Sequence, residues 1–212
     1  MPTSESFDFK GPVGRLEAIL MSPDDAPVAA AVVCHAHPLH GGMMHFKVVF
    51  RIAKALQEQR LAVLRFNFRG VGRSEGVHDD GRGEQDDAVA ALAELERRLP
   101  GLPRVIAGFS FGSVVALRVA AREPRVRAVA ALGFPLVRFG DAATLQAPRQ
   151  PRLFVQGERD PFGSGEALRA LVDPLPPPKE LVVVPGASHF FDEKLDAMQA
   201  AVSSWAATRP WD

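Results

Sequence analysis

One serine in this sequence lies in a pattern suited to nucleophilic chemistry. Ser110 is the centre of a Gly-x-Ser-x-Gly motif, with Gly108 and Gly112 on either side. An apolar run precedes the motif and a helix-like run follows it, which predicts a sharp strand-to-helix turn that exposes the hydroxyl. Glycines suit such a turn because a Cβ there would crowd the neighbouring backbone. The alternative is a glycine-rich turn whose serine only caps the helix.

A histidine that could activate this serine follows later in the chain. His189 ends the segment 185–189, directly after the apolar run 181–184, and no other histidine lies C-terminal to Ser110. A serine hydroxyl is a weak nucleophile, and a neutral imidazole must take its proton during the attack on a carbonyl carbon. We therefore predict that His189 is the general base.

The imidazole in turn needs a carboxylate that holds it in the correct tautomer and stabilises its charged form. Asp160 follows the apolar run 153–156 and is predicted to be this acid. Glu158 lies two residues earlier in the same loop and stays open as an alternative. The order serine, acid, histidine is the one found in proteins with this strand–turn–helix motif.

Backbone N–H groups are predicted to stabilise the negative charge that develops on the carbonyl oxygen of a substrate. The N–H of Phe111, at the start of the helix behind the serine, is the first expected donor. The second should come from the loop 35–42, after an earlier apolar run. Pro38 has no N–H, so His37 or Leu39 remains. We prefer His37, because it lies nearer to the end of that run.

The rest of the sequence alternates between strand-like and helix-like segments. Strands are predicted at 7–9, 16–21, 29–34, 61–68, 105–109, 126–132, 153–156 and 181–184. Helices are predicted at 43–59, 84–99, 113–122, 165–172 and 190–208. The turn residues 11–14 should join the first two strands as an antiparallel hairpin. The later alternation predicts an α/β fold, with a mostly parallel sheet of about eight strands and helices on both faces. The candidate side chains then follow the carboxyl ends of strands, where such sheets bind ligands.

Together these motifs resemble those of a small serine hydrolase of the α/β-hydrolase superfamily, over nearly the whole chain. The segment 69–74, Arg-Gly-Val-Gly-Arg-Ser, is similar to the Arg-Gly-x-Gly-x-Ser turn of that family. The family's His-Gly-x oxyanion signature is replaced by His35-Ala36-His37. The resemblance implies hydrolysis of a small acyl ester or thioester, or of a peptide, through an acyl-enzyme on Ser110. It implies no cofactor and no metal.

The site is predicted to be open. About nineteen residues separate Leu132 from Arg152, too few for the helical cap domain that many relatives insert at this place. We expect the proline-rich segment 134–151 to be irregular, with small or flexible acyl groups as substrates. Six phenylalanines could line an acyl pocket, although most are expected to be ordinary core residues: Phe109, Phe111, Phe134, Phe139, Phe162 and Phe190.

Composition limits the other possibilities. The 212 residues carry no net charge and are 47% hydrophobic, which is typical of one globular domain spanning 1–212. No basic stripe indicates a nucleic-acid partner, and no apolar run approaches the ~18 residues of a membrane helix. The N-terminus is polar, unlike a signal peptide. Cys34 is the only cysteine, which favours a reducing compartment, so we predict a cytoplasmic protein.

Two alternatives belong to other classes. His35, His37 and His40 have a spacing similar to that of metal ligands, which would suit a metal-dependent hydrolase. Leu39 occupies the position where an acidic ligand would be expected, and the number and type of ligands decide such sites. A non-catalytic binding protein on the same fold is the second alternative.

Overall fold

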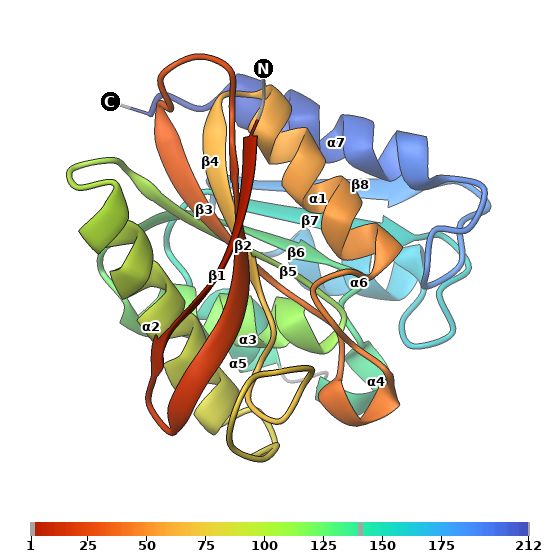
Figure 1. The fold of residues 1–212 in the computed structure, drawn as a ribbon. Coiled ribbons are helices and arrows are strands. Elements are labelled where there is room, and N and C mark those ends of the chain that lie inside the picture. The colour runs from red at the N-terminus through yellow and green to blue at the C-terminus, as the bar shows by residue number, and fades with distance from the viewer. Residues whose placement is uncertain (1–2, 140–141, 212) are drawn as a thin grey trace.

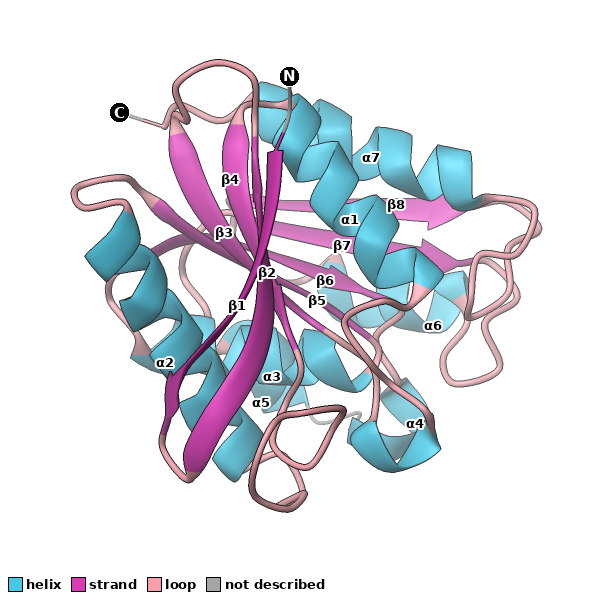
Figure 2. Cartoon of the chain, viewed as in Figure 1, coloured by secondary structure: helices cyan, strands magenta, loops and turns pink. Residues whose placement is uncertain are grey.

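An eight-stranded sheet forms the centre of the computed structural model, which describes residues 3–139 and 142–211 (Figures 1 and 2). The strands are β1 (Thr3–Gly11), β2 (Gly14–Ser22), β3 (Ala29–Cys34), β4 (Leu61–Phe66), β5 (Arg104–Phe109), β6 (Val126–Leu132), β7 (Arg152–Gly157) and β8 (Lys179–Val184). Their spatial order is β1-β2-β4-β3-β5-β6-β7-β8. The pairs β1–β2 and β2–β4 are antiparallel, and the other pairs are parallel. The predicted mostly parallel sheet with an N-terminal hairpin is therefore confirmed.

Helices cover both faces of this sheet. The longer ones are α1 (Lys47–Glu58), α2 (Gly83–Arg98), α3 (Phe111–Arg122), α6 (Gly165–Val172) and α7 (Leu195–Ala207). Short helices are found at η1 (Pro38–His40), α4 (Leu136–Phe139) and α5 (Ala142–Gln146). Helices α1 and α7 contribute to the hydrophobic cluster on one face, whereas α2, α3 and α6 contribute to the cluster on the other.

Strand β3 shows why the central strands read as continuous apolar runs. All six of its residues are buried. Ala30, Val32 and Cys34 belong to the cluster that includes α2 and α3, whereas Ala31 and Val33 belong to the cluster that includes α1. Successive side chains of a strand point to opposite faces, and both faces of this sheet are covered. A strand in this position therefore has no polar face.

Two predicted helices begin later than the sequence indicated. The helix expected from residue 43 begins at Lys47, because the backbone of Met44 is held by β4 and the loop after it. Its N–H donates to Asn67 Oδ1 at 2.8 Å, and its carbonyl accepts from Arg65 Nη1 at 2.7 Å. The helix expected from residue 190 begins at Leu195. Phe191 and Glu193 precede it with positive φ angles of 55° and 59°, which no right-handed helix accommodates.

The connection from β6 to β7 is more ordered than predicted. The segment 134–151, expected to be irregular, contains α4 and α5, although each is only about one turn long. Residues 140 and 141 of this segment lie outside the described part of the chain. Within the described residues no cap domain is inserted between β6 and β7, as predicted.

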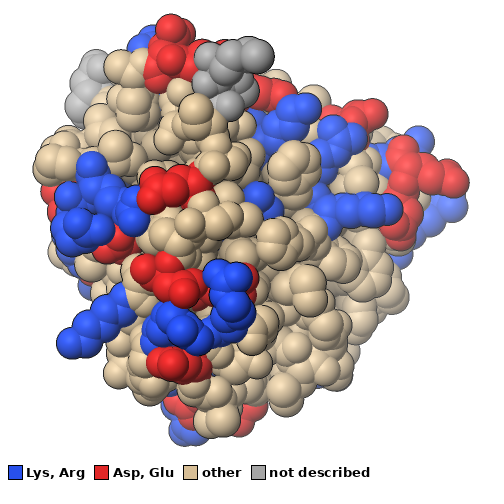
Figure 3. Space-filling view, viewed as in Figure 1, with Lys and Arg blue, Asp and Glu red and all other residues tan. Residues whose placement is uncertain are grey.

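Charged side chains of both signs are mixed on the molecular surface. On the face shown in Figure 3, blue and red groups lie next to one another rather than forming a stripe of one sign. This agrees with the net charge of zero. In residues 3–139 and 142–211, no helix has the length and apolar character needed to cross a membrane.

Candidate active site

Ser110 lies at the turn between β5 and α3 with an unusual backbone conformation. Its φ and ψ angles are 55° and −122°, a sparsely populated region that costs a non-glycine residue about 1–3 kcal/mol. Hydrogen bonds hold the residue there. Its N–H donates to the carbonyl of Leu132 on β6 at 2.9 Å, and its carbonyl accepts from the N–H of Ser113 at 2.8 Å. The turn therefore fixes the serine where β5 ends and α3 begins.

The two glycines of the motif are required by close approach of the backbone. A Cβ at Gly108 would lie 2.0 Å from the carbonyl oxygen of Gly112, and a Cβ at Gly112 would lie 2.3 Å from that of Cys34. Both obstacles are backbone atoms, which cannot move aside as a side chain could. The motif thus brings the start of α3 against the end of β3, where the loop 35–42 begins.

The structure brings the three candidate side chains together at the carboxyl ends of β5, β7 and β8. His189 Nε2 lies 3.0 Å from Ser110 Oγ, and His189 Nδ1 lies 2.7 Å from Asp160 Oδ2. The side chains of His189 and Asp160 are 5% and 0% exposed, whereas Ser110 is partly exposed. The imidazole therefore connects a buried carboxylate to a hydroxyl that solvent or a substrate can reach.

The second carboxylate of this loop has another partner. Glu158 Oε2 accepts a hydrogen bond from the N–H of Gly186 at 2.8 Å. That contact joins the loop after β7 to the loop after β8, which carries His189. Asp160, and not Glu158, is the carboxylate in contact with the imidazole.

The Asp160 carboxylate is held by groups that sequence reasoning missed. Its Oδ2 also accepts from Gln156 Nε2 at 3.0 Å, and its Oδ1 accepts from the N–H of Phe162 at 2.8 Å. Gln156 is fully buried at the end of β7 and also bonds the backbone of Phe134 and Gly163. The one signal in the sequence was the position of Gln156 directly after the apolar residues 153–155. A buried amide needs hydrogen-bond partners, so it indicates polar groups nearby.

Three phenyl rings surround the imidazole of His189. The ring centroids of Phe109, Phe162 and Phe190 lie 5.0, 4.7 and 5.1 Å from that of the imidazole. These rings restrict the rotation of the imidazole and limit the access of water to it. Charge interactions near His189 are strengthened in such an apolar setting.

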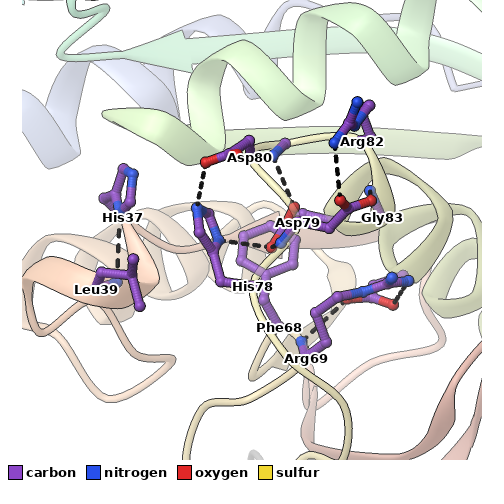
Figure 4. Close-up of polar contacts among 12 residues, drawn as sticks. His37, Leu39, Phe68, Arg69, His78, Asp79, Asp80, Arg82 and Gly83 are labelled. Carbon is purple, nitrogen blue, oxygen red and sulfur yellow. Dashed lines mark hydrogen bonds and ion pairs between the residues drawn. The ribbon is translucent and has the colours of Figure 1, made fainter.

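The loop after β3 distinguishes between the two predicted oxyanion donors. The N–H of Leu39 already donates to His37 Nδ1 at 3.2 Å (Figure 4). Within the described chain, the N–H groups of His37 and Phe111 have no acceptor. The N–H of Ala36 is also without an acceptor there, and it was not among the predicted donors. The geometry thus favours His37 over Leu39 and adds Ala36 as a candidate.

A cavity of about 180 Å³ lies beside Ser110. Its lining residues are Ala36, His37, His40, Ser110, Phe111, Pro135, Arg138, Phe139, Phe162, His189 and Phe190. Four of the six candidate phenylalanines are in this wall, more than the sequence analysis expected, whereas Phe109 and Phe134 are fully buried core residues. Ligand cavities commonly measure ~300–1,000 Å³, so this one suits a small group.

His35 is buried and contacts backbone groups through both of its ring nitrogens. Its Nε2 accepts a hydrogen bond from the N–H of Phe68 at 3.0 Å, and its Nδ1 lies 2.6 Å from the carbonyl oxygen of Ala36. Burial lowers the pKa of His35 to about 4. Both ring nitrogens are therefore engaged, and His35 does not converge with His37 and His40 on one point. Among the residues described, no three His, Cys, Asp or Glu side chains are placed to hold a metal ion.

Comparison with known proteins places this chain in a family. A family model described as an α/β hydrolase domain matches residues 25–207. An uncharacterised protein of Rickettsia prowazekii is 34% identical over 208 residues, which cover 94% of this chain and 87% of the relative.

Two solved structures are similar along nearly their whole length. An α/β serine hydrolase homologue from Coxiella burnetii is 39% identical, with a TM-score of 0.88 and coverage of 94% of this chain and 96% of that one. A Xanthomonas campestris protein, described as an α/β serine hydrolase without lid, is 36% identical, with a TM-score of 0.88 and coverage of 97% and 94%. This chain therefore belongs to the α/β-hydrolase superfamily, as a small hydrolase without a cap domain.

Proposed function

We propose that this protein is a serine hydrolase that cleaves small acyl esters or thioesters through an acyl-enzyme on Ser110. The observation that carries the proposal is the continuous contact from Asp160 through His189 to Ser110. Ser110 also lies on a strained turn and faces a cavity. A serine that only caps a helix would need neither the strain nor the buried His–Asp pair, and Ser110 makes no side-chain capping bond.

In the first half of the proposed reaction, Ser110 Oγ attacks the carbonyl carbon of the substrate. His189 Nε2 takes the hydroxyl proton and then passes it to the leaving alcohol or thiol. Asp160 accepts a hydrogen bond from His189 Nδ1–H and stabilises the imidazolium. The N–H groups of Phe111 and His37 would bind the oxyanion, and each such donor is worth about 3–4 kcal/mol in the transition state.

In the second half, water hydrolyses the acyl-enzyme. His189 removes a proton from the water as it attacks the ester carbonyl on Ser110, and returns that proton to Ser110 Oγ as the acid leaves. The cavity is open toward solvent, since Ser110 is partly exposed and the lining residues Phe162 and Phe190 are 37% and 44% exposed. Water can therefore reach the intermediate without displacement of a cap domain.

The test is covalent labelling with a fluorophosphonate combined with kinetics on 4-nitrophenyl acetate. We expect stoichiometric labelling of Ser110, and turnover reduced about 10⁶-fold in Ser110→Ala and in His189→Ala. The double variant should be no worse than either single variant, because the two side chains act as a unit. Ser4→Ala, at an exposed serine of β1, is the matched control and should keep full activity.

A folded wild-type protein that is neither labelled at Ser110 nor active on any acyl ester, thioester or peptide would overturn the proposal. It would favour a non-catalytic binding protein. Graded thioester and peptide substrates in the same assay distinguish the acyl-transfer classes that share this machinery.

A further inference from the structure

Three side chains of the cavity wall are basic and have no part in the proposed reaction. We call them the basic wall: His37 and His40 from the loop after β3, and Arg138 from α4. Among the described residues, no Asp or Glu side chain lines the same cavity. The other lining groups are apolar or belong to the reaction itself. An alkyl group in this cavity would make no hydrogen bond to any of these three side chains.

Arg138 differs from most arginines of this protein in having no carboxylate partner among the described residues. Arg69 pairs with Asp87 at 2.7 Å, for example, and Arg122 with Asp86 at 2.8 Å. In the described part of the chain, the guanidinium of Arg138 makes no ion pair and no hydrogen bond, whereas its backbone N–H bonds the carbonyl of Pro135 at 3.1 Å. The five N–H donors of this guanidinium are thus left to face the cavity and solvent.

Several basic side chains are gathered around His37. The ring of His37 lies 4.7 Å from the rings of both His40 and His78, measured between centroids. In Figure 4, His37 and His78 face one another from the loops after β3 and β4. Burial lowers the pKa of His37, the neighbouring His78, His40 and Arg138 lower it further, and the negative charge of Glu84 partly opposes this shift. An anion bound in the cavity would relieve this repulsion.

Two carboxylates pair with His78 in the loop behind His37, and Asp80 Oδ1 lies 3.5 Å from His78 Nε2. Glu84 is fully buried, and its Oε1 lies 2.7 Å from His78 Nδ1. Its two oxygens also accept the N–H groups of Asp79 and Gly81, at 2.9 and 2.8 Å. Glu84 is therefore not a residue of the cavity wall, and it does not neutralise Arg138.

We propose that the basic wall binds an anionic group of the substrate, so that the site selects small esters carrying a carboxylate close to the scissile bond. This inference rests on the proposed hydrolase function. A guanidinium matches the geometry of a carboxylate with two parallel hydrogen bonds. The rings of Phe139 and Phe162 on the same cavity reduce the local dielectric, which strengthens the attraction. A cavity of one sign of charge also concentrates substrates of the opposite sign.

The experiment compares matched neutral and anionic esters. Ethyl butyrate and monoethyl succinate differ by a carboxylate on the acyl side. The esters 3-methylphenyl acetate and 3-acetoxybenzoate differ by one on the alcohol side. For each pair, the kcat/KM of the anionic ester divided by that of the neutral ester is measured in wild type, Arg138→Gln and Arg138→Lys. The matched control is Arg127→Gln, at an exposed arginine of β6 that does not line this cavity.

We expect the wild type to prefer the anionic member of at least one pair. Arg138→Gln should lower that ratio roughly tenfold to a hundredfold, as expected for a hydrogen bond to a charged group. Arg138→Lys should retain part of the ratio, and Arg127→Gln should leave it unchanged. Added sodium chloride should lower the wild-type ratio, because salt screens an exposed charge.

Two outcomes would overturn the inference, and each is distinguishable from failure of the proposed function. A wild type that hydrolyses neutral esters but shows no preference for either anionic ester removes the basis for an anion site. A preference that is the same in Arg138→Gln, with the variant folded by circular dichroism, removes the role of the basic wall. If wild type hydrolyses no ester of either kind, the hydrolase proposal fails and this inference fails with it.

Discussion

At the scale of single residues, the site depends on which polar atoms are already satisfied. Asp160 uses both carboxylate oxygens, two of its bonds coming from Gln156 and Phe162, so its orientation toward His189 is fixed. Glu158 also carries a carboxyl group, but its oxygen accepts a hydrogen bond from the N–H of Gly186. The role of each carboxylate therefore depends on the group that its oxygens contact, because both side chains are of the same chemical type.

The first residue-scale prediction concerns these two carboxylates. Asp160→Asn should lower kcat about 10⁴-fold, because an amide would favour the wrong tautomer of His189. Glu158→Gln should change kcat by less than about tenfold, since it affects only a loop contact. Steady-state kinetics of both variants on one ester test this. A large loss in Glu158→Gln beside a small loss in Asp160→Asn would transfer the acid role to Glu158.

The second residue-scale prediction concerns pH. His35 is neutral when folded, with a pKa near 4, but unfolding returns the pKa to its ordinary value of about 6.5. The unfolded state therefore binds more protons below about pH 6.5, and stability falls as the pH drops from there toward 4. Between pH 7.5 and 5.0 the loss from this group should be about 2 kcal/mol.

Urea unfolding at these two pH values measures this loss, with His35→Gln as the comparison. The glutamine oxygen can accept the Phe68 N–H in place of Nε2 but does not titrate. Wild type should lose about 2 kcal/mol more than the variant over this range. Equal losses in the two proteins would contradict the assignment of the depressed pKa to His35.

At the scale of elements, the turn from β5 to α3 is the part on which the site depends most. It must carry a strained serine while the start of α3 touches the end of β3. The hydrogen bond from Ser110 N–H to the carbonyl of Leu132 stabilises the strained conformation. The neighbouring strand β6 therefore helps to hold the turn, together with β5. The conformation of Ser110 thus depends on β6 lying next to β5 in the sheet.

The element-scale prediction is that Gly112→Ala damages both folding and activity. Its Cβ would lie 2.3 Å and 2.5 Å from the carbonyl oxygens of Cys34 and His35, so we expect a loss of about 3 kcal/mol or more. Gly101→Ala is the control: its φ is +79° but nothing lies within 4 Å, so only about 1 kcal/mol should be lost. Gly112→Val should be worse still.

Urea unfolding and turnover of both alanine variants provide the measurement. Gly101→Ala should retain wild-type turnover, since Gly101 precedes β5 and the turn that carries Ser110 follows the other end of that strand. Wild-type stability and activity in Gly112→Ala would show that the contact with β3 is looser than the structure has it.

At the scale of the whole molecule, the absence of a cap domain determines what the site can hold. The described part of the β6–β7 connection forms only α4 and α5, and the cavity beside Ser110 is about 180 Å³. Two of the side chains that line it, Phe162 and Phe190, are apolar and exposed. The molecule can thus bind a short acyl group in the cavity while a longer chain remains in water.

The whole-molecule prediction concerns acyl-chain length and aggregation of the substrate. The kcat/KM for 4-nitrophenyl esters should be greatest for chains of about two to four carbons and fall roughly tenfold or more by about twelve carbons, because the cavity is small. The rate should rise smoothly with substrate through its solubility limit, as no lid has to open. A sharp rise at that limit would indicate interfacial activation and a movable covering segment.

The sequence alone determined the features that depend on neighbouring residues. Strands buried on both faces must be apolar throughout, so runs such as 29–34 and 126–132 could be placed at their observed bounds. The Gly-x-Ser-x-Gly turn was equally recognisable, because its steric demand falls on residues adjacent in the chain. The convergence of Ser110, Asp160 and His189 could be expected as well, since parallel strands end at one edge of the sheet.

Only the tertiary structure decided between groups that lie close together in sequence but meet different partners in space. It showed Asp160 in contact with the imidazole, Leu39 N–H already in use, and Met44 held by Asn67 ahead of α1. It also brought Arg138 to the same cavity as His37 and His40 from a segment expected to be irregular. These outcomes depend on hydrogen bonds and charges between distant loops, and no local pattern of residue types encodes them.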